Sequence, residues 1–174
     1  KKVKAKFSYI PDELFYFMQA DTMEMKRFYE GIYPQFDSKL FYKMQEFFPT
    51  IDVKRTIRRL SKGMQKQVAF WLAICCKPDL LILDEPVDGL DPVMRRQIWS
   101  ILMAEVAERK MTVLVSSHNL RELEDTCDHV GIMHHGKIMI ERSLSDLQGN
   151  ISKIQVACQN GVPKLPDDFE VLHM

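Results

Sequence analysis

The chain has 174 residues, of which 46% are hydrophobic and 28% charged, as is usual for a globular protein with one sizeable core. Basic and acidic residues both total 24, so the net charge is zero and gives no support for a nucleic-acid or anionic-membrane partner. No apolar run approaches the ~20 residues that a membrane-spanning helix needs, and no secretory signal is visible.

The first third of the chain predicts one strand followed by helices. A basic segment leads into a strand over Phe7–Ile10. Thr22 is expected to cap a helix that runs to about Tyr33, and Asp37 and Ser38 to cap a second helix that ends at Phe48.

Apolar residues recur in that second helix at three- and four-residue spacing, which predicts one buried face: Leu40, Phe41, Met44, Phe47 and Phe48. A methionine- and aromatic-rich segment can be mistaken for a cofactor site. Core packing, with a groove for a partner helix, is the favoured interpretation.

A run of cations follows: Lys54, Arg55, Arg58, Arg59, Lys62 and Lys66. Such a run usually marks a solvated face, but because this one leads into a predicted helix start, part of it can face phosphates. Ser61 is a good N-cap for the apolar helical stretch Val68–Ile74, and Gly63 allows a ligand to approach the backbone closely. The start of this helix fits either an anion site or an ordinary capped core helix.

The stretch Leu80–Leu83 is an unbroken apolar run, typical of a strand buried on both faces in a parallel sheet. Asp84 and Glu85 follow it directly. One acid can hold Mg²⁺ through water and the next can orient or deprotonate an attacking water, or both can simply be acidic loop residues. Asp91 and Pro92 then open a helix as N-cap and first-turn proline.

The helix over residues 92–109 is expected to bury Ile98, Ile101, Leu102 and Val106. Another buried strand, from Val113, ends in Ser116-Ser117-His118, and Asn119 can cap a following helix. A histidine at a strand end is usually structural or exposed, but here it can lie beside Glu85 at the same sheet edge.

Two further strands, Val130–Met133 and Lys137–Ile140, flank a turn of His-His-Gly. Gly131 to Lys137 therefore matches the spacing of a phosphate loop only by chance, because a real one lies between a strand and a helix. A histidine pair at a turn can bind metal, although an exposed loop pair is favoured. The four cysteines form no C-x-x-C, which favours buried free thiols: Cys75, Cys76, Cys127 and Cys158.

The segments around Ser61, Glu85 and His118, in this order, resemble the ATP-binding cassette (ABC) ATPase family. Leu60–Met64 is similar to its signature motif, Leu80–Glu85 to its Walker B strand and Val87–Asp91 to its D-loop, while His118 matches the switch histidine. Tyr9–Glu13 stands where the Q-loop should be.

The sequence departs from the family pattern at three positions. Lys62 replaces the first glycine of the signature and adds a cation beside a phosphate site, and Met64 replaces its usual glutamine. Asp12 holds the place of the Q-loop glutamine, where an acid can still contact metal or water. The family's phosphate loop should precede the Q-loop and is not found there, so the chain is expected to be a fragment that is inactive alone.

The resemblance implies an α/β P-loop NTPase (RecA-like) core with an inserted helical subdomain. The implied division is residues 1–13 for the strand and Q-loop, 14–59 for the helical subdomain, 60–148 for the signature helix and the rest of the core, and 149–174 for a truncated extension with a candidate strand, Ile151–Cys158. The helical subdomain docks the membrane subunit in this family, and its shortness favours a transporter ATPase.

The implied function is the ATP-binding and ATP-hydrolysing subunit of a bacterial transporter of the export-type branch. The cofactors would be ATP and Mg²⁺, and the partners a transmembrane permease subunit and a second ATP-binding subunit, identical or not, at the cytoplasmic face of the cell membrane. No nucleic acid is expected. The alternatives are a soluble ABC-type ATPase in translation or DNA repair, or, for the chain alone, a non-catalytic interaction module.

The family's residue roles carry over to matching positions. Asp84 would hold Mg²⁺, Glu85 would activate water and His118 would contact the γ-phosphate. The signature of a second subunit would bind the same phosphate through residues equivalent to Ser61 and Gly63, with Lys62 and Met64 beside them and Asp91 linking the two sites.

Overall fold

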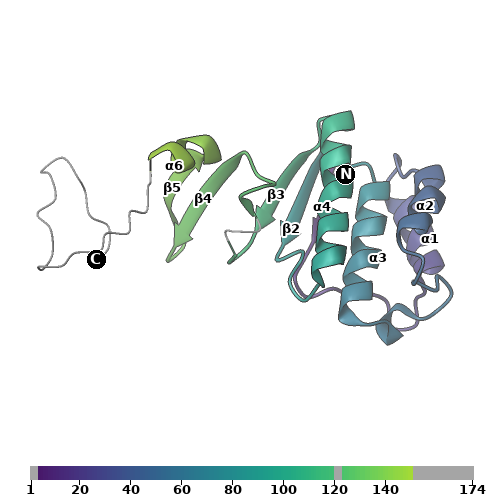
Figure 1. Cartoon of the computed structure of the whole chain (residues 1–174). Coiled ribbons are helices and arrows are strands. Elements are labelled where there is room, and N and C mark those ends of the chain that lie inside the picture. The colour runs from purple at the N-terminus through teal and green to yellow at the C-terminus, as the bar shows by residue number, and fades with distance from the viewer. Residues whose placement is uncertain (1–3, 120–122, 151–174) are drawn as a thin grey trace, which may run out of the picture. The chain divides into compact units, whose positions relative to one another are not determined.

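The computed structural model describes residues 4–119 and 123–150 of the chain (Figure 1). Its contacts define two compact units, Lys1–Thr126 and Cys127–Met174. The larger unit contains the predicted signature, the acidic strand and His118, so the candidate site lies within one unit.

A three-stranded parallel sheet forms the centre of the larger unit, in the order β1-β2-β3. The strands are β1 (Phe7–Ile10), β2 (Leu80–Asp84) and β3 (Thr112–Ser116), and β1 has the predicted bounds. Asp84 pairs with Ser116, the last residue of β3, so the carboxyl ends of these two strands are level.

The two faces of this sheet differ in burial. Leu81 and Leu83 are buried on one face, where helices α3 and α4 cover the sheet in Figure 1, whereas Leu80 and Ile82 on the other face are only half-buried. In β3, Leu114 is 60% exposed. The prediction of strands buried on both faces is therefore wrong for the described residues, since an apolar run does not reveal how many faces are covered.

Helices α1 (Thr22–Ile32) and α2 (Ser38–Met44) lie in the segment between β1 and the signature. Asp21, not Thr22, is the N-cap of α1, because its carboxylate and Glu24 make a reciprocal capping box. Asp37 caps α2 as predicted, but the α-helix ends at Met44 and continues as the 3₁₀ turn η2 (Gln45–Phe47).

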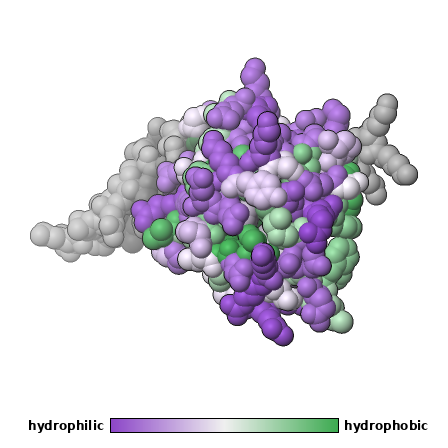
Figure 2. Space-filling view, turned by 90° about the vertical axis from the view of Figure 1, so that its right-hand side faces the viewer, coloured by the Kyte–Doolittle hydropathy of each residue, from purple (hydrophilic) through white to green (hydrophobic). Residues whose placement is uncertain are grey.

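An exposed aromatic patch, defined as Phe15, Phe17, Met18 and Phe28, lies on α1 and the loop before it. The Phe17 and Phe28 rings meet edge to face, with centroids 4.9 Å apart. Figure 2 views the side of α1 and α2 and shows hydrophobic side chains gathered among hydrophilic ones. Four large apolar side chains left in solvent are typical of a surface that binds another molecule.

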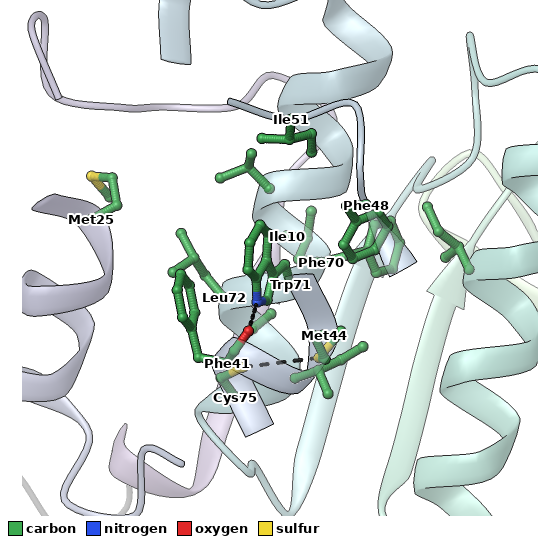
Figure 3. Packing of buried hydrophobic residues seen from close by; sticks show 14 of the residues in the cluster. Ile10, Met25, Phe41, Met44, Phe48, Ile51, Phe70, Trp71, Leu72 and Cys75 are labelled. Atoms are coloured by element: carbon green, nitrogen blue, oxygen red, sulfur yellow. Dashed lines mark hydrogen bonds between the residues drawn. The ribbon is translucent and has the colours of Figure 1, made fainter. Parts of the chain in front are cut away.

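Helix α3 (Lys62–Cys75) is the centre of the core, with Ser61 as its N-cap as predicted. Trp71 is fully buried, stacks on Phe41 with ring centroids 4.5 Å apart and donates its indole N–H to the Phe41 carbonyl at 2.8 Å (Figure 3). Loss of such a buried aromatic commonly costs about 3–5 kcal/mol, so this contact fixes α2 against α3. Phe48 also packs here, but Phe47 is 43% exposed, against prediction, because the 3₁₀ turn rotates it outward.

The 3₁₀ turn η3 (Ile57–Arg59) leads into the signature, and a short 3₁₀ turn η1 (Lys4–Lys6) precedes β1. Helix α4 (Pro92–Arg109) begins at its predicted N-cap, Asp91, with proline in the first turn. It buries Ile98 and Leu102, while Ile101 and Val106 are partly buried against the same core.

The smaller unit contains the antiparallel pair β4 (His129–His134) and β5 (Lys137–Ser143), followed by α6 (Leu144–Asn150). His135 and Gly136 join the strands, both with positive φ, as in a tight hairpin turn. The prediction that Gly131 to Lys137 is no phosphate loop is confirmed. The candidate strand Ile151–Cys158 and the helix start at residues 120–122 lie outside the described residues.

Cys75 and Cys76 are buried free thiols, as predicted, and burial raises the pKa of both well above the usual range. Cys127, which was also expected to be buried, is only half-buried. Within residues 4–119 and 123–150, no group of three or more histidine, cysteine or acidic side chains could hold a metal ion. None of the helices described here is long and apolar enough to span a membrane.

Candidate functional site at the carboxyl edge of the sheet

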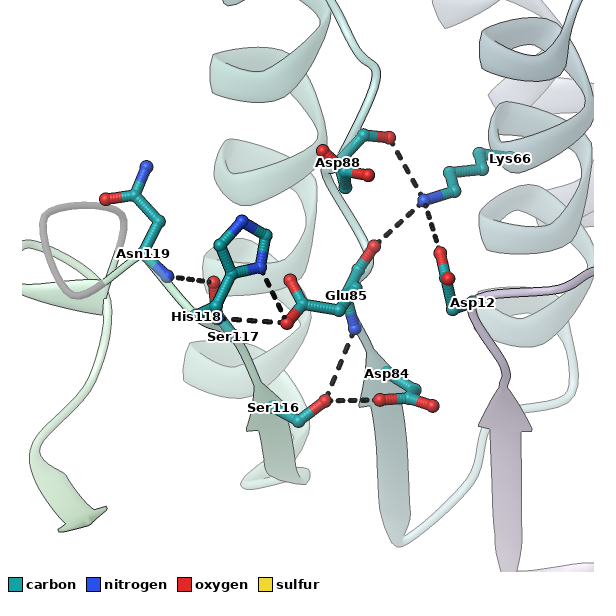
Figure 4. Close-up of polar contacts among 9 residues, drawn as sticks. All are labelled: Asp12, Lys66, Asp84, Glu85, Asp88, Ser116, Ser117, His118 and Asn119. Atoms are coloured by element: carbon teal, nitrogen blue, oxygen red, sulfur yellow. Dashed lines mark hydrogen bonds and ion pairs between the residues drawn. The ribbon is translucent and has the colours of Figure 1, made fainter. Parts of the chain in front are cut away.

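The candidate site lies where the three parallel strands end (Figure 4). Asp12 follows β1, Glu85 follows β2 and His118 follows β3, and the first two turns of α3 lie beside them. Ligands bind beyond the carboxyl ends of strands in open α/β sheets, because helix starts and loops with free polar groups meet there. The structure thus brings together residues that are far apart in the sequence.

Asp84 is fixed by the neighbouring strand. Its Oδ1 accepts a hydrogen bond from the Ser116 hydroxyl at 2.5 Å, and that hydroxyl accepts one from the Glu85 N–H at 3.3 Å. The Glu85 N–H also lies 3.2 Å from the Ser116 carbonyl. A half-buried carboxylate beside a hydroxyl offers hard oxygen ligands, which suit Mg²⁺ completed by waters and phosphate oxygens.

Glu85 has a backbone φ of 43°, in the left-handed region that residues with a Cβ atom avoid. Such a conformation persists only where surrounding contacts hold it, and it is common at functional sites. The Glu85 carboxylate contacts His118 in the loop after β3, whereas the Asp84 carboxylate contacts Ser116 within β3, so the two adjacent acids have different partners.

The Glu85 carboxylate meets His118. Its Oε1 accepts the His118 backbone N–H at 2.9 Å and lies 2.9 Å from the imidazole Nδ1. The His118 side chain is 76% exposed and that of Glu85 27% exposed. The prediction that these residues lie side by side is confirmed, and an exposed imidazole remains accessible to a ligand.

Lys66 is the residue that sequence reasoning misplaced. The cation run predicts either a solvated face or contact with phosphates, but Lys66 is only 8% exposed, and its ammonium contacts Asp12 Oδ1 at 3.3 Å. It also donates to the carbonyls of Glu85 and Asp88, at 2.9 and 3.0 Å. The helical spacing could have indicated this burial, because Lys66 lies four residues before Phe70 and therefore on the buried side of α3.

The predicted signature residues surround the start of α3. The Ser61 hydroxyl accepts the Met64 N–H at 3.2 Å, as an N-cap does, and Lys62 is exposed. A Cβ on Gly63 would lie 3.3 Å from Leu90, so glycine also permits close packing of α3 against the loop before α4. These contacts are separate from those that join Asp84, Glu85 and His118.

Asp91 acts as a helix cap. One carboxylate oxygen accepts the N–H groups of Val93 and Met94, both at 3.0 Å. The N-cap part of its prediction is confirmed, and the role in linking two sites stays a prediction.

Comparisons with known proteins agree with this geometry. A family model described as "AAA domain, putative AbiEii toxin, Type IV TA system" matches residues 8–124. The ABC transporter ATP-binding protein YtrB of Bacillus subtilis (strain 168) is 30% identical over 161 residues, 92% of this chain and 55% of that protein. The bacitracin transport ATP-binding protein BcrA of Bacillus licheniformis is 34% identical over 125 residues, 70% of this chain and 41% of that protein. The chain spans about half the length of these curated relatives.

Solved structures share the fold. An ATP-binding subunit of an ABC transporter superposes with a TM-score of 0.74 at 26% identity, over 84% of this chain and 62% of that one. A bacterial Atm1-family ABC exporter with ATP bound gives a TM-score of 0.69 at 18% identity, which supports the fold alone. The class defined by this fold and site is the P-loop NTPase domain, and the matched family model describes residues 8–124 as an AAA domain. The chain belongs to the family of ABC transporter ATP-binding proteins.

Proposed function

We propose that this chain is the part of an ABC transporter subunit that hydrolyses ATP and couples the hydrolysis to transport through a membrane partner. The observation that carries the proposal is the set of Asp84, Glu85 and His118 at one sheet edge, with the two acids held in different directions. Phosphoryl transfer to water needs a cation beside the phosphates and a group that positions the water, and these residues can supply both.

Asp84 would hold Mg²⁺, which neutralises charge on the phosphate oxygens. The Ser116 hydroxyl orients its carboxylate, so one oxygen is kept in a fixed direction. Glu85 would orient the attacking water and accept its proton, since a carboxylate within hydrogen-bond reach acts as a general base. His118 would contact the γ-phosphate while its backbone N–H keeps the Glu85 side chain in place.

A second ATP-binding subunit, identical or not, would complete the site. Ser61, Lys62, Gly63 and Met64 would face the γ-phosphate held by that second subunit, because a capped helix start presents N–H groups and positive potential to an anion. Asp91 would connect the two sites across the dimer, and Asp12 would sense the nucleotide from the end of β1.

The aromatic patch is the proposed docking surface for a transmembrane permease subunit. Beside it is a hollow of about 130 Å³ at the end of β1, lined by Tyr9, Ile10, Pro11, Leu14, Phe15, Tyr16, Tyr29, Ala69 and Ala73. A hollow next to exposed rings suits a short amphipathic helix from a partner. The subunit would then be peripheral, at the cytoplasmic face of the cell membrane.

Relatives named for bacitracin and lantibiotic transport support an export-type system.

The test uses Asp84→Asn in the full-length protein, with Asp79→Asn as the matched control. Asp79 precedes the same strand at its opposite end and pairs with Lys6 in solvent. We expect Asp84→Asn to raise the Mg²⁺ concentration needed for half-maximal ATP hydrolysis at least about tenfold, because each charged metal ligand contributes strongly to affinity. Asp79→Asn should leave it unchanged. An unaltered Mg²⁺ dependence in Asp84→Asn would remove the metal role from this residue.

A further inference from the structure

Lys66 joins three segments of the candidate site, and we propose that it is a positioning residue for ATP hydrolysis that acts through Glu85. The inference rests on the proposed function of the site. Its ammonium has three N–H donors and three acceptors: the Asp12 carboxylate and the carbonyls of Glu85 and Asp88 (Figure 4). The Lys66 side chain is 11% exposed, so its ammonium is largely shielded from water, whereas the side chain of its partner Asp12 is 52% exposed.

The two carbonyls belong to the two ends of one turn. The Asp88 N–H donates to the Glu85 carbonyl at 3.3 Å, and Lys66 then bonds to both carbonyls from the side of α3. A turn that begins at a left-handed, non-glycine residue is intrinsically disfavoured. A buried cation on the two carbonyl oxygens is the kind of surrounding contact that keeps such a turn in place.

The orientation of the Glu85 side chain depends on this turn. Its carbonyl direction is set by Lys66 and its N–H direction by Ser116, so the backbone is fixed on both sides of the Cα atom. The side chain then reaches His118. Without the ammonium the turn could relax, the carboxylate would aim at its water in a smaller fraction of molecules, and kcat would fall without a matching change in KM.

The contact with Asp12 links the same turn to the loop after β1. That loop is also tied to α3 by the Tyr16 hydroxyl, which donates to the Gln65 carbonyl at 2.6 Å, and it continues into the aromatic patch at Phe15 and Phe17. Lys66 therefore contacts both the loop that leads to the proposed docking surface and the backbone of the residue that carries the proposed catalytic carboxylate.

The test compares Lys66→Met with Lys26→Met in the full-length protein. Methionine keeps an unbranched apolar stem and removes the ammonium. Lys26 is the matched control, because it is 6% exposed and its ammonium contacts Glu30 and Ser38, on the helical segment away from the sheet edge. We expect Lys66→Met to lower kcat for ATP hydrolysis by about 10- to 100-fold with KM within about threefold. Lys66→Arg should recover part of the rate, and Lys26→Met should leave kcat unchanged.

A double-mutant cycle separates positioning from a general structural effect. In a Glu85→Gln background, Lys66→Met should cause little further loss, because its effect passes through the Glu85 carboxylate. Additive losses, or a Lys66→Met kcat within about twofold of wild type, would overturn the inference. Equal losses of kcat in both lysine variants would also overturn it. A wild-type protein without ATPase activity would instead refute the proposed function, and this inference with it.

Discussion

Replacing Glu85 with glutamine removes one negative charge and almost no volume. The Gln side-chain oxygen can still accept the His118 backbone N–H, which now lies 2.9 Å from Glu85 Oε1. Glutamine cannot take a proton from water at neutral pH. The variant thus isolates the basicity of this side chain from its shape.

The structure sets the expected magnitudes. Loss of a general base lowers turnover by about 10²–10⁴-fold, which corresponds to roughly 3–5 kcal/mol in the activation free energy. The cost in folding should be small, because the partner imidazole is 76% exposed and such pairs contribute less than about 1 kcal/mol. For a protein of this size that shifts the Tm by about 2–4 °C at most.

The assay combines phosphate release, ATP binding by calorimetry and size-exclusion mass with and without ATP and Mg²⁺. We expect turnover to collapse in Glu85→Gln while the Kd for ATP stays within about threefold of wild type. Unhydrolysed ATP should then hold two full-length subunits together. Glu108→Gln, exposed on α4, is the control and should behave as wild type. Wild-type hydrolysis by Glu85→Gln would refute the general-base role, and lost ATP binding would instead assign this carboxylate to the metal side.

Two other predictions concern an exposed contact and a half-buried one. His118→Ala should lower ATP turnover at least about tenfold with a Tm change under about 3 °C, because the imidazole is largely solvent-exposed; near-normal specific activity with a large loss of stability would point to a structural histidine. Lys77 at 2.7 Å and then the Leu40 N–H hold the pKa of Asp37 below its usual range. Its ionisation therefore adds stability above pH ~4 that is lost as the pH falls. Asp37→Asn keeps the cap, so urea unfolding should show about 1 kcal/mol lost at pH 7 and a smaller difference at pH 3; equal differences at both pH values would contradict this reasoning.

Local chemistry made several elements predictable. Ser61 and Asp91 are the N-caps of α3 and α4 because a short polar side chain before an apolar run satisfies the free N–H groups of the first turn. The order of strands and helices brought Glu85 and His118 to one edge, since parallel strands end on the same side of the sheet. Both kinds of inference use neighbours in sequence or the direction of a strand.

The errors have local and tertiary causes. Thr22 and Asp21 are both good caps, but Glu24 stands three residues after Asp21, and the two make a reciprocal capping box, which is a local signal in favour of Asp21. Phe47 fits a helical repeat, but the helix tightens to 3₁₀ after Met44 and the repeat no longer holds. Likewise, the residues of β3 alternate between exposed and half-buried, and this alternation in burial can be predicted only once it is known which side of the sheet the helices cover.

Lys66 shows why a charge is hard to place from sequence. A cation in a run of cations is normally solvated, and burial of one without partners would be costly. Its partners are a carboxylate 54 residues earlier and two carbonyls about twenty residues later, none of which has a local signature. One of these acceptors, the Glu85 carbonyl, belongs to a residue with a positive φ of 43°. A charge–backbone contact of this kind therefore depends on the same left-handed residue that directs the proposed catalytic carboxylate, and a residue change at either position should be felt at the other.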